Sequence, residues 1–174
     1  MKNKSSIRFG TYLGLALIAT HLLWFILDML IVTPADQLTT VILIFVFIIL
    51  SMKELRDIEG DGYIKYKHAF FQGVKTVAYA SILYSAYYFI FIQFIDPEYI
   101  VKTLDAAEEQ YYAMAESGFI EEDKVEEMIE LAREKTTPLF TVMNGILALI
   151  FGGSIVSLIA AAFMKKNNPN PFEA

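Results

Sequence analysis

The sequence predicts an all-α, polytopic membrane protein with four transmembrane helices and an extracytoplasmic amphipathic helical hairpin between helices 3 and 4. Two observations lead to this prediction. Hydrophobic residues make up 56% of the 174-residue chain, and they form uncharged runs of about the 20 residues that a helix needs to cross a bilayer. Between Asp96 and Lys135 lie 13 acidic and only 4 basic residues, so this segment carries a net charge of −9.

The spans are expected in one membrane domain, 1–174, at about residues 9–32, 34–52, 68–95 and 138–164. Pro34 suits the first turn of the second span, because proline lacks an N–H that would be unbonded there. Gly60-Asp61-Gly62 predicts a turn before the third span. Thr137-Pro138 predicts an N-cap followed by proline at the start of the fourth. The polar tail, 165–174, is expected to be disordered.

The acidic segment is predicted to form a hairpin of two helices over residues 97–135. Asp96-Pro97 would cap and open the first helix, and Ser117-Gly118 would end it. The second helix, about 121–135, places acidic residues first and basic residues last, which complements the helix dipole. Apolar residues of the first helix recur at helical spacing, namely Ile100, Leu104, Tyr111 and Met114 or Ala115. Such an apolar side must be buried against another surface.

Basic residues predict the orientation of the chain. They gather before the first span, in the loop between the second and third spans, and after the fourth span. Because cytoplasmic loops are enriched in lysine and arginine, we expect both termini in the cytoplasm and hairpin 97–135 outside it. The acidic charge of the hairpin disfavours nucleic-acid binding, since it would repel phosphate.

Five polar residues within or beside the predicted spans are tentative candidates for a functional role, because polar groups are costly inside a membrane. They are His21, Asp28, Gln72, Lys75 and Gln93. Asp28 and Lys75 can also be explained as boundary anchors at opposite membrane faces, since uncharged runs long enough to span lie beside them. His21 and Asp28 share a helix face, but two ligands without a third do not make a metal site.

No catalytic, cofactor-binding or metal-binding residue is predicted. Cysteine is absent, and the chain has only two histidines, on different spans. The segment from Asp57 to Gly62 resembles the start of a calcium-binding loop, but its twelfth position is His68 instead of a carboxylate. We therefore expect no enzyme activity and no cofactor. A lipid-modifying enzyme would need polar groups clustered at one membrane face, which the sequence does not offer.

Small residues at a spacing of four predict close helix packing by the fourth span. They are Gly145, Gly153, Ser157 and Ala161. This small-residue face could pack within the bundle or between two copies of the chain.

Motifs along most of the chain resemble a family of small bacterial membrane proteins called domain of unknown function 4199, typical of Bacteroidota. They are Gly10 and Gly14, Gly62-Tyr63-Ile64 with Ala69-Phe70 and Gly73, Phe94-Ile95-Asp96-Pro97, and Gly152-Gly153 with Ser157-Leu158-Ile159-Ala160-Ala161 and Lys165-Lys166. The resemblance implies four spans with an amphipathic segment before the last. It implies no activity, so no functional residue is carried over from it.

The sequence and the resemblance together favour an uncharacterised, multi-pass protein of the bacterial inner (plasma) membrane. Its partners would be the lipid bilayer and a protein bound through hairpin 97–135, or another copy bound through the hairpin or the small-residue face. We expect a non-catalytic interaction or accessory protein. The alternative is a small oligomeric transporter or channel, whose path would be lined by His21, Asp28, Gln72, Lys75 and Gln93.

Overall fold

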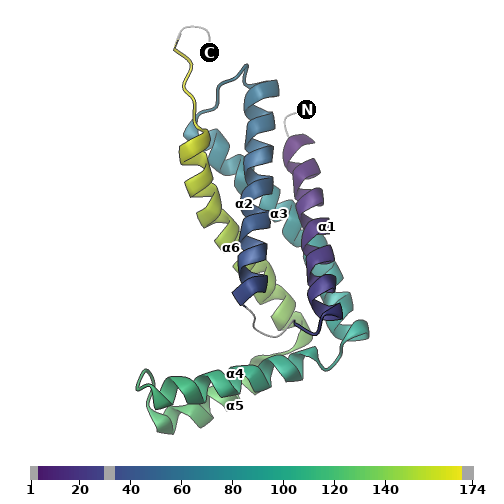
Figure 1. The fold of residues 1–174 in the computed structure, drawn as a ribbon, viewed down its shortest axis with the longest axis vertical. Coiled ribbons are helices and arrows are strands. Elements are labelled where there is room, and N and C mark those ends of the chain that lie inside the picture. Colours follow the sequence, from purple (N-terminus) through teal and green to yellow (C-terminus); the bar gives the residue numbers. More distant parts are fainter. Residues whose placement is uncertain (1–3, 30–33, 170–174) are drawn as a thin grey trace.

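The computed structural model describes residues 4–29 and 34–169, and this part of the chain is helical (Figure 1). Four helices in it are long and apolar enough to cross a membrane. They are α1 (Lys4–Ile26), α2 (Pro34–Glu54), α3 (Tyr66–Ile90) and α6 (Pro138–Met164). Short π-helical turns continue two of them, η1 (Leu55–Glu59) after α2 and η2 (Phe91–Ile95) after α3. The prediction of an all-α protein with four membrane-spanning helices is confirmed.

The first span differs most from its predicted bounds of 9–32. Helix α1 starts earlier, at Lys4, because the small side chains of Ser5 and Ser6 pack into the bundle and are buried. The helix ends at Ile26, and Asp28 adopts the left-handed conformation with φ 55°, which aspartate tolerates better than most residues. Hydropathy did not locate this end because the residues around it are still apolar. Residues 30–32 of the predicted span lie outside the described residues.

The predicted turn at Gly60-Asp61-Gly62 is confirmed, but the polar tail after the fourth span is not as expected. Asp61 and Gly62 have φ angles of 47° and 85°, and Tyr63 N donates to Gly60 O at 2.7 Å. After α6, Lys166 and Ile64 exchange two backbone hydrogen bonds of 2.9 Å each. The prediction of a disordered tail is therefore wrong for its first residues. Hydropathy could not reveal this pairing, because it depends on backbone groups.

Helix α3 lies at the centre of the bundle, where glycines allow its neighbours to approach closely. A Cβ atom added to Gly153 of α6 would lie 2.6 Å from both methyl groups of Val77. One added to Gly73 of α3 would lie 2.9 Å from Ser157 Cβ. Gly153, Ser157 and Ala161 are buried, so this part of the small-residue face packs within the bundle. Gly145 has no atom within 4 Å of such a Cβ.

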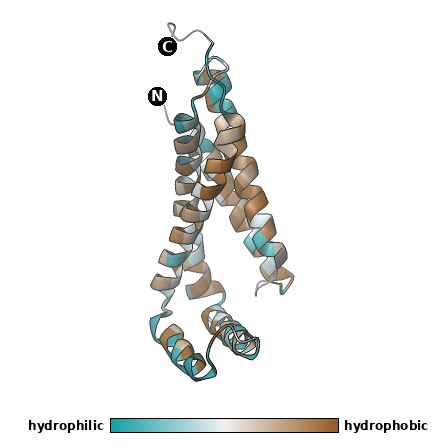
Figure 2. Ribbon diagram, turned by 90° about the vertical axis from the view of Figure 1, so that its left-hand side faces the viewer, coloured by the Kyte–Doolittle hydropathy of each residue, from teal (hydrophilic) through white to brown (hydrophobic). Residues whose placement is uncertain are grey.

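The acidic segment forms helices α4 (Tyr99–Glu116) and α5 (Val125–Lys135), joined through the short turn η3 (Glu122–Lys124). They lie side by side across one end of the bundle, as Figures 1 and 2 show. The start of α1, the end of α6 and the turn between α2 and α3 lie at the opposite end (Figure 1). Figure 2 shows the apolar spans between these two more polar ends.

Three helix-end signals near the hairpin were predicted, and two are confirmed. Gly118 ends α4 with φ 78°, and the Thr137 side chain accepts a hydrogen bond from Phe140 N at the start of α6. The predicted cap by Asp96 is wrong, since α4 begins at Tyr99. The carboxylate of Asp96 instead accepts hydrogen bonds from Lys102 Nζ, each 3.1 Å long. The carboxylate of Asp96 therefore binds Lys102, in the first turn of α4, instead of a backbone N–H at the helix start.

Candidate functional site

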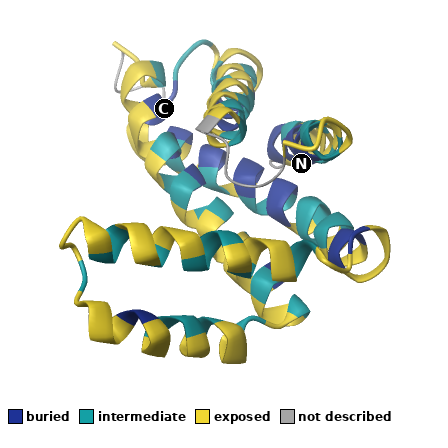
Figure 3. Cartoon of the chain, turned by 60° about the horizontal axis from the view of Figure 1, so that its bottom comes forward, coloured by how far each residue is buried: buried dark blue, intermediate teal, exposed yellow. Residues whose placement is uncertain are grey.

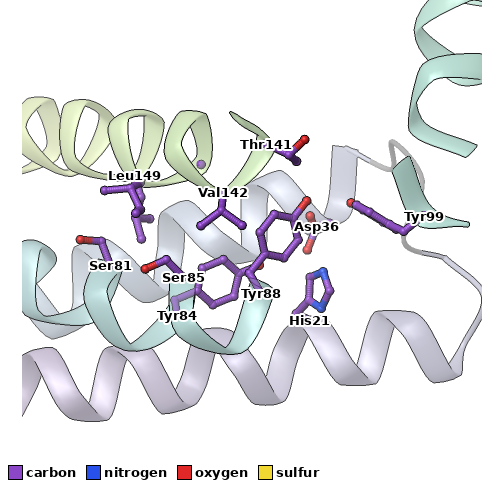
Figure 4. A pocket seen from close by; sticks show the side chains of 12 residues that line it. His21, Asp36, Ser81, Tyr84, Ser85, Tyr88, Tyr99, Thr141, Val142 and Leu149 are labelled. Atoms are coloured by element: carbon purple, nitrogen blue, oxygen red, sulfur yellow. The ribbon is translucent and has the colours of Figure 1, made fainter. Parts of the chain in front are cut away.

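A cavity of about 210 Å³ lies where the bundle meets the hairpin (Figure 4). Helices α1, α2, α3, α4 and α6 all contribute to it. Its lining combines one carboxylate, one imidazole, three tyrosines and several small or apolar side chains. The lining residues are His21, Asp36, Ser81, Tyr84, Ser85, Tyr88, Tyr99, Thr141, Val142, Gly145, Ile146 and Leu149.

The end of α3 positions the aromatic part of this site. Tyr84 and Tyr88 are one helical turn apart, so both reach the same side of α3. The π-helical turn η2 then buries Phe91, which packs with Val142 of α6 in an apolar cluster beside the cavity. Tyr99, in the first turn of α4, packs against this cluster, so the hairpin closes one side of the site.

His21 is buried in the wall of the cavity, with 7% of its surface exposed. Its Nδ1 lies 2.9 Å from the hydroxyl oxygen of Tyr87. Its ring stands edge-on to Phe91, at 4.6 Å between centroids and an interplanar angle of 88°. Within the described structure, His21 Nε2 and Trp24 Nε1 are buried without a hydrogen-bond partner. A buried polar atom left unpaired costs about 1–3 kcal/mol, so both atoms stand out.

Three rings of the cavity stand at steep angles to one another. The planes of His21 and Tyr88 meet at 89°, those of Tyr88 and Tyr99 at 84°, and those of His21 and Tyr99 at 65°. The centroids of these pairs are 5.7, 6.1 and 6.3 Å apart. Tyr84 stacks on Tyr88 at an interplanar angle of 11°. Burial raises the pKa of Tyr99 above its ordinary value, so its hydroxyl is neutral at physiological pH.

Asp36 supplies the carboxylate among the residues that line the cavity. It lies in the first turn of α2, where the positive end of the helix dipole stabilises a negative charge. Asp36 takes part in none of the ion pairs formed by the described residues. The described part of the chain also contains no group of three or more His, Asp or Glu residues placed to hold a metal ion.

A second polar cluster lies towards the opposite end of the bundle and is satisfied internally. Gln72 Nε2 donates to Ser51 Oγ at 2.8 Å, and Ser51 Oγ lies 2.8 Å from Thr76 Oγ1. Thr76 Oγ1 also donates to the carbonyl oxygen of Gln72, and Ser5 Oγ donates to that of Ser51. All four residues are buried. These contacts join α1, α2 and α3, so the cluster connects helices.

The five polar residues predicted from the sequence do not come together in one chain. His21 lines the cavity, whereas Gln72 belongs to the second cluster. Asp28, Lys75 and Gln93 are exposed on the surface of the bundle and line no part of the cavity. A single copy therefore does not form the continuous path that the transporter alternative requires, and that path would have to arise between copies.

Sequence reasoning missed Asp36 and the tyrosines as members of a site. Asp36 falls in the first turn of the second predicted span, 34–52, and nothing in the sequence shows which helix faces it. Tyr84 and Tyr88 lie within the third predicted span, 68–95, among several other aromatic residues. Their spacing of four residues, which places both on one side of the third span, was the available signal.

The fold and the cavity together define an all-helical membrane protein with four spans and a crosswise helical hairpin. The chain belongs to the family described as "Protein of unknown function (DUF4199)", whose model matches residues 8–166. No curated protein and no solved structure matches the chain.

Proposed function

We propose that this protein is a non-catalytic accessory protein of the membrane, and that its acidic hairpin binds a basic segment of another protein. The observation that carries the proposal is the position of the hairpin. Its helices pack mainly on each other and extend sideways from the bundle, so most of their surface is exposed (Figure 3). A segment that only closed the end of the bundle would be buried against it.

The charge of the hairpin indicates the kind of partner. Three of its four basic residues form ion pairs within the hairpin, with Asp96, Asp105, Glu108 and Glu121 as their partners. The other nine acidic residues of the segment take part in none of these pairs. Such a surface attracts a basic protein segment and is repelled by anionic lipid head groups.

The ion pairs of Arg133 help to hold α5 beside α4. Arg133 Nη2 lies 2.7 Å from Glu108 Oε2 and 3.6 Å from Asp105 Oδ1. We expect Arg133→Ala to accelerate amide hydrogen exchange in α5 and to leave the spans unchanged, because exposed pairs contribute modestly. Lys135→Ala is the matched control, since Lys135 belongs to none of the hairpin's ion pairs. Equal exchange in both variants would contradict a role for Arg133.

The proposed orientation places the hairpin outside the cytoplasm. The opposite end of the bundle, with both chain termini, then lies in the cytoplasm. The bias of basic residues supports this orientation. Because the chain has no cysteine, a single introduced one is a unique probe. In intact cells, Glu127→Cys should react with a membrane-impermeant maleimide, whereas Glu59→Cys should react only after lysis. The reverse pattern would overturn the orientation.

Photocrosslinking in cells tests the partner. Phe119, at the tip of the hairpin, is 81% exposed and can be replaced by a photoreactive phenylalanine derivative. We expect a crosslink to one protein with a basic segment. Reversing two exposed charges of α5, in Glu126→Lys/Glu130→Lys, should abolish it.

The control reverses two exposed charges at the other end of the bundle, in Asp57→Lys/Glu59→Lys, and should leave the crosslink unchanged. Crosslinks only to lipid, or only to a second copy of this chain, would refute the proposed partner. A crosslink that survives charge reversal in α5 would refute the electrostatic basis.

A further inference from the structure

The cavity beside His21 has a composition that the proposed role of the hairpin does not use. It places the carboxylate of Asp36 beside aromatic rings, between helix ends. The dipole of α2 offsets part of the cost of a carboxylate in such partly dry surroundings, and a facing positive charge would offset more. Asp36 takes part in no ion pair formed by the described residues. The site therefore favours a ligand that brings its own positive charge.

The rings offer a second attraction for a cation. Tyr88, Tyr99 and His21 line the cavity together, and their planes meet at 65–89°. A cation over the face of a tyrosine is attracted by the negative charge of the ring face, and the attraction strengthens when water is excluded. A tyrosine face that borders the cavity adds to the attraction that the carboxylate exerts on a cation.

The size and the oxygen content of the cavity narrow the choice of cation. At about 210 Å³ it is smaller than the roughly 300–1,000 Å³ typical of sites for drug-sized ligands. Calcium would need six to eight oxygen ligands, and no cluster of metal-binding side chains exists among the described residues. A small organic ammonium group fits a cavity of this size with a single carboxylate and aromatic walls.

The polar lining favours an ammonium group that can donate hydrogen bonds. Asp36, Ser85 and Thr141 all line the cavity and offer acceptor oxygens. In the tautomer whose Nδ1–H donates to Tyr87, the unpaired Nε2 of His21 is a further acceptor. A quaternary ammonium group has no N–H to donate to any of them. The lining therefore suits a primary ammonium group better.

We propose that this cavity binds a primary ammonium group, with Asp36 as its counter-charge and the rings of Tyr88 and Tyr99 in the cavity wall beside it. His21 lies five residues before the end of α1, and Asp36 lies in the first turn of α2. At a rise of about 1.5 Å per residue, both are near the level of lipid head groups. The ammonium group can therefore come from an ethanolamine phospholipid or from a free small amine.

Binding can be followed by the fluorescence of Trp24, because this residue is the only tryptophan and lies one helical turn from His21 on α1. The full-length protein is placed in phosphatidylcholine nanodiscs and titrated with free ethanolamine, choline or neutral ethylene glycol. In a second arm, native mass spectrometry compares retention of phosphatidylethanolamine with that of phosphatidylcholine. A response to free ethanolamine, or preferential retention of the ethanolamine lipid, supports the proposal and identifies the source.

Two variants and a matched control assign binding to the cavity. Asp36→Asn should weaken binding at least about tenfold by removing the counter-charge. Gly145→Leu should abolish it, because Gly145 lines the cavity and open space surrounds its Cβ position. Gly152→Leu is the control, since it also meets no atom within 4 Å but lies outside the cavity. It should bind as the wild type does.

Several results would overturn the proposal. They are equal binding of choline or ethylene glycol, no response in either arm, and unchanged binding by Gly145→Leu. If Asp36→Asn does not fold, Gly145→Leu and its control still decide the question. None of these outcomes depends on the hairpin binding a protein.

Discussion

Replacing Gly10 by leucine is expected to lower the free energy of unfolding by about 3 kcal/mol, the upper end of the cost of overpacking. A Cβ atom at Gly10 would lie 2.6 Å from Tyr79 Cβ and 2.7 Å from the carbonyl oxygen of Thr76. Because that oxygen belongs to the backbone of α3, it cannot turn aside as a flexible side chain could. The helices α1 and α3 would have to separate, and thermal unfolding in detergent would show a lower midpoint.

The control for this substitution is Gly152→Leu on α6. It introduces the same side chain into a spanning helix, but no atom lies within 4 Å of its Cβ position. We expect no loss, and a gain of up to about 1 kcal/mol, because glycine is a poor helix former. Equal destabilisation by both variants would contradict the close approach of α1 and α3.

Much of the fold was predictable because membrane spans are defined by composition over long windows. Helix α6 begins at Pro138, as the Thr137-Pro138 signal predicted, and ends at Met164. The start of α4 was not predictable from Asp96-Pro97, because the carboxylate of Asp96 binds Lys102 instead of a helix N–H. Local signals fail where a side chain from the next turn offers a charged partner.

The candidate site was much less predictable than the fold. Hydropathy and spacing identified His21 as an unusual residue, but they paired it with Asp28 on its own helix. The structure pairs its ring with Tyr87 and places it beside Asp36, from α3 and α2. Which faces of four helices meet depends on packing, such as the contacts of Gly10 and Gly153. A single sequence does not reveal which residues of two neighbouring helices contact each other.

Substitutions of Gln72 and its partner Ser51 test whether a polar residue within a span serves structure or transport. Its Nε2 donates to Ser51 Oγ at 2.8 Å, and both side chains are buried. We expect Ser51→Ala to lower the free energy of unfolding by about 1–2 kcal/mol, because it leaves the amide of Gln72 buried without this partner. The midpoint of unfolding in sodium dodecyl sulfate measures the loss.

The double variant Ser51→Ala/Gln72→Leu should cost less than the sum of the two single variants, because it removes both partners of the hydrogen bond. Additive losses would show that the two side chains are not coupled. If Gln72 instead lined a transport path, Gln72→Leu would reduce flux into liposomes while leaving stability unchanged. Since Thr76 and Ser5 also bond within this cluster, we expect the loss of stability. Gln72 then holds together the end of the bundle opposite the cavity.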